Sequence, residues 1–115
     1  MQQQIDEWLK VLAEKSNRLV VRFGDREIKY ILEPGRKYTR VVKEESRKYN
    51  PGKWNESKTI SKSVHAFIDN LNGDIYKASG WKAPAKNGAR FNVVNDIETL
   101  IKVCDEFGSY LYKKR

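Results

Sequence analysis

The sequence EIKYILEPGRKYTRVVKE at residues 27–44 contains two alternating segments with a turn between them. In residues 27–33, apolar side chains recur at every second position, which is the pattern of a half-buried strand. Pro34-Gly35 follows as a turn signal, and residues 37–44 alternate again. This stretch therefore predicts two antiparallel strands joined by a short turn.

The residues before this stretch predict a helix and a further strand. Over residues 4–15, apolar side chains recur with the spacing of an amphipathic helix, and Trp8 and Leu12 are among them. Residues 18–23 are rich in Val and Leu, and Gly24-Asp25 is a turn signal. We expect a strand at 18–23, so that three consecutive strands form an antiparallel meander.

Two loops and two more strands are expected downstream. Residues 45–62 lack periodicity, which predicts a long basic loop. Residues 63–69 and 75–78 alternate, and residues 70–74 between them hold Asn-Gly, a hairpin signal. Residues 79–92 contain Gly and Pro at intervals that forbid regular structure, so we expect a second, basic aromatic loop there.

The C-terminal part predicts a second helix and a last strand. Residues 96–107 place Leu100 and Cys104 on one apolar stripe, and residues 109–113 are suited to a short strand. The chain therefore predicts a single α+β domain over residues 1–115, with an antiparallel sheet of about five strands. The N-terminal and C-terminal helices are expected to pack on one face of that sheet. We expect its core to include Trp8, Leu12, Leu100 and Cys104.

The net charge of +8 is confined to the middle of the chain. Residues 36–90 hold thirteen basic and five acidic residues, whereas the two kinds balance in residues 1–35 and 91–115. A basic segment between two segments of zero net charge favours a surface that binds anions, such as nucleic acid or nucleotides. The alternative is a set of solvated lysines on loops.

Few residues are suited to catalysis or metal binding. Cys104 is the one cysteine, which excludes an intrachain disulfide and a cysteine zinc cluster. His65 is the one histidine, and a lone strand histidine is more often a packed residue than a general base. No apolar run is long enough to span a membrane. We expect a non-enzymatic protein of a reducing cytoplasm, without cofactor or metal.

The strongest functional pattern is DIYKASGWKAPAKNGARFN at residues 74–92. Basic side chains recur with aromatic ones between them; cations neutralise phosphates and aromatic rings stack on bases. The upstream basic strand adds a second wall. We expect one anion-binding surface formed by Lys77, Trp81, Lys82, Lys86, Arg90, Asn92, Arg40 and Tyr38. The alternative is that the aromatic residues are core anchors and the cations are solvated.

Residues 63–93 also carry a distinctive combination of short motifs. It consists of His-Ala-Phe at 65–67, Gly-Asp-Ile-Tyr-Lys at 73–77, Trp-Lys-Ala-Pro-Ala-Lys at 81–86 and Ala-Arg-Phe-Asn at 89–92. This combination resembles a family of small tailed-phage proteins of unassigned function. The resemblance implies a phage origin and a location in the host cytoplasm, and it implies no activity.

Three kinds of function fit these patterns. The localised charge and interleaved aromatic residues favour a small protein that binds nucleic acid, either single-stranded DNA or RNA. The same chemistry closed into a pocket would bind a nucleotide, as in a phage protein that sequesters a host signalling molecule. A third reading is an inhibitor that docks on an acidic patch of a host enzyme or defence protein. The patterns leave the oligomeric state open.

Overall fold

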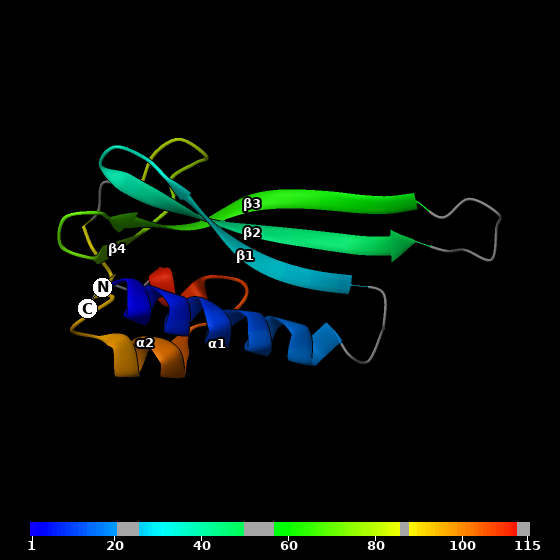
Figure 1. Ribbon diagram of the computed structural model, residues 1–115, viewed down its shortest axis with the longest axis horizontal. Coiled ribbons are helices and arrows are strands. Elements are labelled where there is room, and N and C mark those ends of the chain that lie inside the picture. The colour runs from blue at the N-terminus through cyan, green and yellow to red at the C-terminus, as the bar shows by residue number, and fades with distance from the viewer. Residues whose placement is uncertain (21–25, 50–56, 86–87, 113–115) are drawn as a thin grey trace.

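Five strands form one antiparallel sheet, and two helices lie against one of its faces (Figure 1). The computed structural model describes residues 1–20, 26–49, 57–85 and 88–112. Neighbouring strands follow the order β1-β2-β3-β4-β5. This arrangement confirms the predicted α+β class with an N-terminal and a C-terminal helix. The elements are α1 (Gln2–Val20), β1 (Arg26–Pro34), β2 (Tyr38–Tyr49), β3 (Ser57–Asp69), β4 (Asp74–Lys77), β5 (Phe91–Asn92), α2 (Ile97–Val103) and the 3-10 turn η1 (Ser109–Leu111).

The β1–β2 hairpin forms where the sequence predicts it. The two strands pair without a register break over the whole of β1. In the turn, the Gly35 N–H donates a hydrogen bond to the Tyr38 carbonyl at 2.9 Å. A Cβ added at Gly35 would lie 2.7 Å from that same oxygen, so the close approach of the backbone requires glycine.

The strands β2 and β3 are longer than predicted. Residues 45–49 pair with residues 57–61, so the prediction of an irregular loop over 45–62 is wrong for them. Residues 50–56 lie outside the described part of the chain. The sequence of these residues is mostly polar and lacks the apolar alternation by which a strand is predicted. Figure 1 shows it extending past the end of α1.

The N-terminal helix is also longer than predicted. α1 continues to Val20, so the strand predicted at 18–23 is wrong for residues 18–20. Residues 21–25 lie outside the described ranges. Arg18 and Leu19 are good helix formers, and the helix extends through them although the Val-rich composition favours a strand.

The fifth strand and the last element differ from the prediction. Phe91-Asn92 forms β5 against β4, within the loop predicted over 79–92. The sheet therefore reaches five strands with β5 in place of the strand expected at 18–23. Residues 109–111 form a 3-10 turn, so the strand predicted over 109–113 is wrong for residues 109–112, and Lys113 lies outside the described residues.

Helix α2 is shorter than the helix predicted over 96–107. The Asp105 carboxylate accepts hydrogen bonds from the N–H groups of Phe107 and Ser109, at 3.0 and 3.2 Å. Such a side-chain turn competes with continuation of the helix. Phe107 is consequently 73% exposed and does not extend the apolar stripe.

One extra residue interrupts the β2–β3 ladder. The register shifts between Val41 and Val42, because β3 holds an additional residue, His65, at this point. The bulge brings both His65 and Ala66 to the helix side of the sheet, where His65 faces the helix α1. Phe67 then faces away from the helices.

The core lies between the helices and the sheet. Trp8 and Leu12 of α1, Leu100 of α2 and Cys104 after it are all buried in one apolar cluster, as predicted. Full burial of one such leucine stabilises the fold by about 2 kcal/mol. Burial also raises the pKa of the Cys104 thiol, so Cys104 acts as a small apolar core residue.

A lysine of α1 donates hydrogen bonds to the last carbonyl groups of α2. The Lys15 ammonium donates hydrogen bonds to the carbonyls of Ile101 at 2.8 Å, Lys102 at 3.0 Å and Cys104 at 3.0 Å. The last carbonyls of a helix lack partners within the helix and carry the negative end of its dipole. Lys15 therefore joins the two helices through charge-assisted bonds.

We expect Lys15→Met to lower the free energy of unfolding by about 2 kcal/mol, because hydrogen bonds from a charged donor contribute more than neutral ones. Urea denaturation followed by circular dichroism measures the change. Lys10→Met, at an exposed position of the same helix, is the matched control and should change stability little. Equal effects of the two substitutions would contradict the capping role of Lys15.

Candidate functional site

Four strands contribute one row of side chains to the face of the sheet that the helices leave uncovered. Glu33 of β1 lies opposite Arg40 of β2, Arg40 lies opposite Phe67 of β3, and Phe67 lies opposite Tyr76 of β4. Directly paired residues share a face of the sheet. The row therefore places a carboxylate, a guanidinium and two aromatic rings side by side.

Phe67 is the centre of a small aromatic cluster on this face. It is only 3% exposed although no helix covers it. The Tyr38 ring packs edge-on against Phe67 at 6.2 Å between centroids and against Tyr76 at 5.8 Å. The Arg40 guanidinium lies 5.8 Å from the Phe67 ring centroid. These neighbours bury Phe67 and fix the position of Tyr38 beside it.

Arg40 holds the loop that follows β4 onto the sheet. Its Nε donates to the Trp81 carbonyl at 2.8 Å, and its guanidinium lies 5.0 Å from the centroid of the Trp81 ring. Its Nη1 bonds the Glu33 carboxylate at 2.8 Å. Arg40 thus fixes Trp81 above the sheet, and the Trp81 side chain stays 43% exposed.

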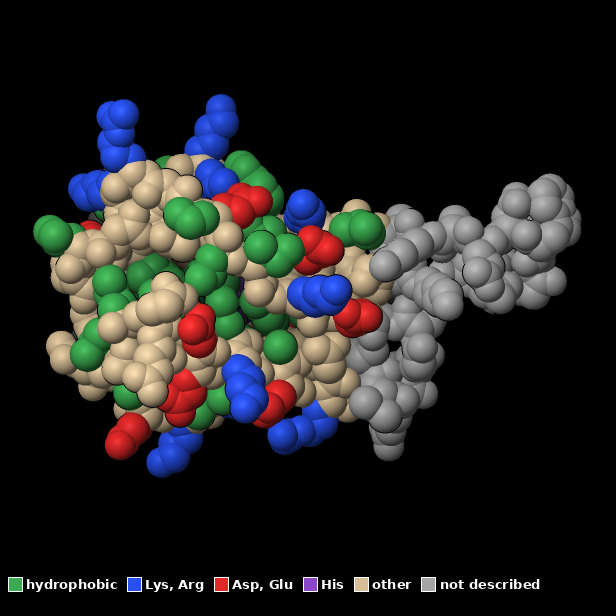
Figure 2. Space-filling model, viewed as in Figure 1, with side chains coloured by type: hydrophobic (Ala, Val, Ile, Leu, Met, Phe, Trp, Pro, Cys, Tyr) green, Lys and Arg blue, Asp and Glu red, His purple; other side chains and the backbone are tan. Residues whose placement is uncertain are grey.

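A cavity of about 320 Å³ opens at the β1–β2 turn, beside this cluster. Its charged lining consists of four cations and a single acid, Glu33, which is already paired with Arg40. Figure 2 shows basic side chains projecting from the end of the molecule where this turn lies. We call the surface around the cavity the basic aromatic face; it comprises Arg36, Lys37, Tyr38, Arg40, Phe67, Trp81 and Lys82.

Four of the eight predicted site residues meet on the basic aromatic face. These four are Tyr38, Arg40, Trp81 and Lys82. Arg36, Lys37 and Phe67 are not among the eight predicted residues. Arg36 and Lys37 do belong to the upstream basic stretch that is expected to form the second wall, whereas no pattern points to Phe67.

The predicted convergence is wrong for three other residues. Lys77 lies opposite Ala66, on the helix side of the sheet, with its ammonium 4.1 Å from the Tyr112 ring centroid. Arg90 is 3% exposed and donates from Nε to the Leu111 carbonyl at 2.7 Å. Arg90 therefore holds the C-terminal segment rather than facing solvent.

The third residue, Asn92, uses its side chain within the fold. Its amide nitrogen donates to the Asn72 carbonyl at 2.9 Å, and its amide oxygen accepts the N–H groups of Val94 and Asn95 at 3.0 Å. It links the β3–β4 hairpin to the turn before α2. Lys86, the last of the eight predicted residues, lies outside the described residues.

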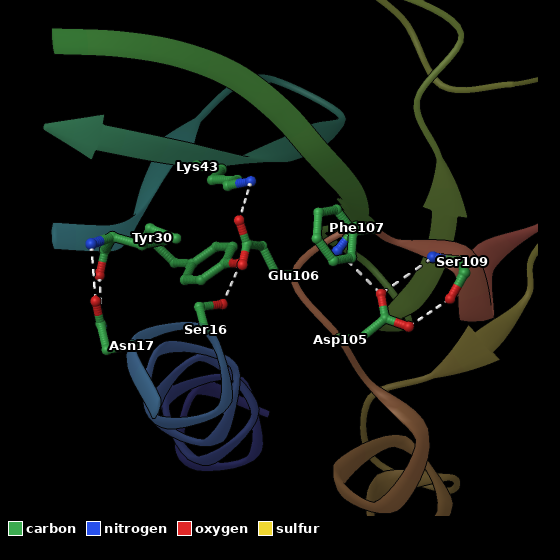
Figure 3. Close-up of polar contacts among 9 residues, drawn as sticks. Ser16, Asn17, Tyr30, Lys43, Asp105, Glu106, Phe107 and Ser109 are labelled. Atoms are coloured by element: carbon green, nitrogen blue, oxygen red, sulfur yellow. Dashed lines mark hydrogen bonds and ion pairs between the residues drawn. The ribbon is translucent and has the colours of Figure 1, made fainter. Parts of the chain in front are cut away.

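A second group of polar side chains lies buried between α1, the sheet and the C-terminal segment (Figure 3). The Ser16 and Tyr30 hydroxyls are 2.9 Å apart, and the Lys43 ammonium bonds the Glu106 carboxylate at 2.9 Å. Burial raises the pKa of Tyr30 to about 12, so its hydroxyl stays protonated at neutral pH. These pairs satisfy polar groups that packing has removed from water.

His65 belongs to the same buried region. Its Nε2 lies 2.6 Å from the Tyr110 hydroxyl, and its ring packs against Tyr30 and Trp8. Burial, together with the nearby charge of Lys43, lowers the pKa of His65 to about 4. A neutral imidazole accepts the tyrosine hydroxyl and needs no counter-charge, which is the packed role expected for His65.

These features define a small α+β protein with a basic aromatic face on the uncovered side of its sheet. Over residues 2–113 the chain matches a family of unknown function, DUF7717, and it belongs to that family. No curated protein and no solved structure matches the chain. Within the described ranges, no helix has the length and apolar character to cross a membrane, and no group of three or more His, Cys, Asp or Glu side chains is placed to hold a metal ion.

The buried His65 predicts a loss of stability in mild acid. The unfolded chain, with a histidine pKa of 6.5, binds a proton before the folded protein does, so the free energy of unfolding falls as the pH drops from about 6.5 to 4. The contribution of His65 to this fall is roughly 3 kcal/mol. Urea unfolding across this pH range measures it.

His65→Gln is the comparison variant, because it keeps a polar side chain and removes the titration. The variant should be less stable at neutral pH and should lose less stability toward pH 4 than the unmodified protein. The carboxylates contribute to both proteins, so the difference between the two pH profiles isolates His65. Parallel profiles would contradict the assignment.

Proposed function

We propose that this protein binds single-stranded nucleic acid through the basic aromatic face. The observation that supports this most is the cavity at the β1–β2 turn, where four cations and one paired acid surround Tyr38 and Phe67. Phosphate contacts from cations supply the affinity of such surfaces, and aromatic rings supply stacking with bases. Both elements lie here on one face of one sheet.

The cations divide into two groups by their contacts. Arg36, Lys37 and Lys82 are exposed at the rim of the cavity, where they can reach phosphates. Arg40 is instead paired with Glu33 and held against Trp81, so its role is to position the indole. The proposal therefore assigns phosphate binding to the three rim residues and base stacking to Trp81.

Single strands fit this surface better than a duplex. Stacking on a protein ring requires a base whose face is accessible, and bases in a duplex are stacked on one another. Trp81 remains 43% exposed while Arg40 fixes its position, so it offers a preformed ring surface. A ring already held in place loses little side-chain entropy on binding.

The cavity volume favours a free nucleotide as the second candidate ligand. About 320 Å³ lies at the lower end of the range of roughly 300–1,000 Å³ found for small-molecule sites. A nucleotide would saturate the site at one molecule per chain, and its affinity would depend on the base. The phage setting, the host cytoplasm and an acidic protein partner rest on the sequence patterns alone and stay predictions.

We expect Lys82→Ala to lower the salt dependence of oligonucleotide binding by about one unit of log–log slope, because one phosphate contact is lost. Fluorescence anisotropy of a labelled single strand, titrated at several salt concentrations, measures the slope. Lys102→Ala removes an exposed lysine from α2 and is the matched control. The proposal fails if Lys82→Ala combined with Arg36→Ala leaves binding at low salt equal to that of the control.

Trp81→Ala should weaken the same binding by about 1–3 kcal/mol while the salt slope stays unchanged, because stacking releases few counterions. Trp81→Phe keeps an aromatic ring at this position and should recover part of the loss. A parallel panel of mononucleotides and cyclic nucleotides distinguishes the second candidate. Saturable binding of one nucleotide without oligonucleotide binding would replace the proposed function.

A further inference from the structure

The strand β1 forms one edge of the sheet, and its outer side has no strand partner in the described residues. It is nine residues long. An exposed edge of this length presents backbone N–H and C=O groups that are ready to pair with another strand. On the opposite side of the sheet, β5 has two residues and β4 pairs with β3 only at residues 66–68, so residues 57–65 of β3 also lack a strand partner there in the described part of the chain. β1 is therefore the edge that a single strand forms over its whole length.

A side chain from α1 already pairs with part of this edge. The Asn17 amide donates to the Ile28 carbonyl at 2.9 Å and accepts the Ile28 N–H at 2.9 Å. The backbone groups of Ile28 therefore point outward, away from β2. Since the direction alternates along a strand, the backbone groups of Tyr30 and Leu32 also point outward.

We propose that two copies of this chain associate by antiparallel pairing of β1 with the partner's β1, with Ile31 on the two-fold axis. In this register Tyr30 lies opposite the partner's Leu32, and each pair exchanges two backbone hydrogen bonds. Pro34 lies opposite the partner's Ile28. Proline has no N–H to donate, and Asn17 has already satisfied Ile28, so neither residue loses a bond by this placement.

The charges of β1 fit the same register. Lys29 lies opposite the partner's Glu33, and the two-fold axis repeats this pair, so two ion pairs flank the centre of the interface. A register shifted by two residues, with Tyr30 on the axis, would put Glu27 opposite the partner's Glu33, where like charges repel. It would also put Leu32 opposite the partner's Ile28, whose backbone groups Asn17 occupies.

Apolar surface along this edge supports the same partner. Ile31 is 37% exposed on the uncovered face of the sheet, and the pairing buries it against the partner's Ile31. Beside the edge, a groove of about 610 Å³ runs between α1 and β1, with Leu9 and Ala13 on its helical side. Asp6 and Lys10 also line this groove.

Disulfide trapping tests both the association and its register. Across the axis, the Cα atoms of Ile31 and the partner's Ile31 would be about 4.5 Å apart, which is within the range for a disulfide. Ile31→Cys should therefore form a covalent dimer under mild oxidation. Lys29→Cys lies on the same strand and face, but the two introduced cysteines of the dimer would be about 13 Å apart, so this variant should not crosslink. Cys104 is buried and is retained in both variants.

The unmodified protein should also show a mass that rises from 13.5 kDa toward twice that value with concentration in sedimentation velocity. Lys29→Glu should suppress this rise, because it places two acidic pairs across the interface, whereas Lys102→Glu should not. A constant monomer mass, or crosslinking of Lys29→Cys as fast as Ile31→Cys, would overturn the proposal. Circular dichroism confirms that each variant is folded before it is compared.

Discussion

The extra residue in β3 determines which side chains face the helices and which face away. The His65 ring faces Trp8 and Tyr110 in the core, and because His65 is the bulged residue, Ala66 faces the helices as well and Phe67 points to the other face. An unbroken alternation from Val64 onward would have turned Phe67 toward the helices and Ala66 outward. The burial of Ala66 in the core and the place of Phe67 on the basic aromatic face therefore depend on the same irregularity of the backbone.

The basic aromatic face contains a second, smaller cluster of packed side chains. Phe67 is buried there by Tyr38, Tyr76 and the guanidinium of Arg40, without a helix above it. On this face the Trp81 loop takes the place of a covering helix, and Arg40 attaches that loop to the sheet by a hydrogen bond to the Trp81 carbonyl. The exposed cations lie in the β1–β2 turn and in the Trp81 loop, around aromatic rings that these contacts hold in place.

The sequence predicts this fold well where apolar residues alternate on one face, as they do in residues 27–33. It misses the pairing of residues 45–49 with 57–61, because a mostly polar sequence gives no periodic signal. The sequence also predicts a longer α2 than the structure has, because the turn at Asp105 that follows the helix depends on local hydrogen bonds and not on hydrophobic spacing.

The candidate site, like the fold, is predictable only in part from the sequence. Tyr38 and Arg40 share a face because they are two residues apart on one strand, and both line the cavity at the β1–β2 turn. Lys77 is one residue from Tyr76, so the same alternation turns it to the opposite face. The burial of Arg90 depends on its contact with the distant Leu111 carbonyl, for which no local pattern exists.

The two edges of the sheet are unequal, and this limits how large an assembly built by strand addition can become. Growth of a fibre requires each molecule to offer two edges, one for the molecule before it and one for the molecule after it. Here β1 is one continuous strand of nine residues, whereas on the opposite side β4 and β5 are short and leave residues 57–65 of β3 without a strand partner in the described part of the chain. Pairing of β1 with the partner's β1 about a two-fold axis uses the same edge of both copies, so this contact closes at two chains.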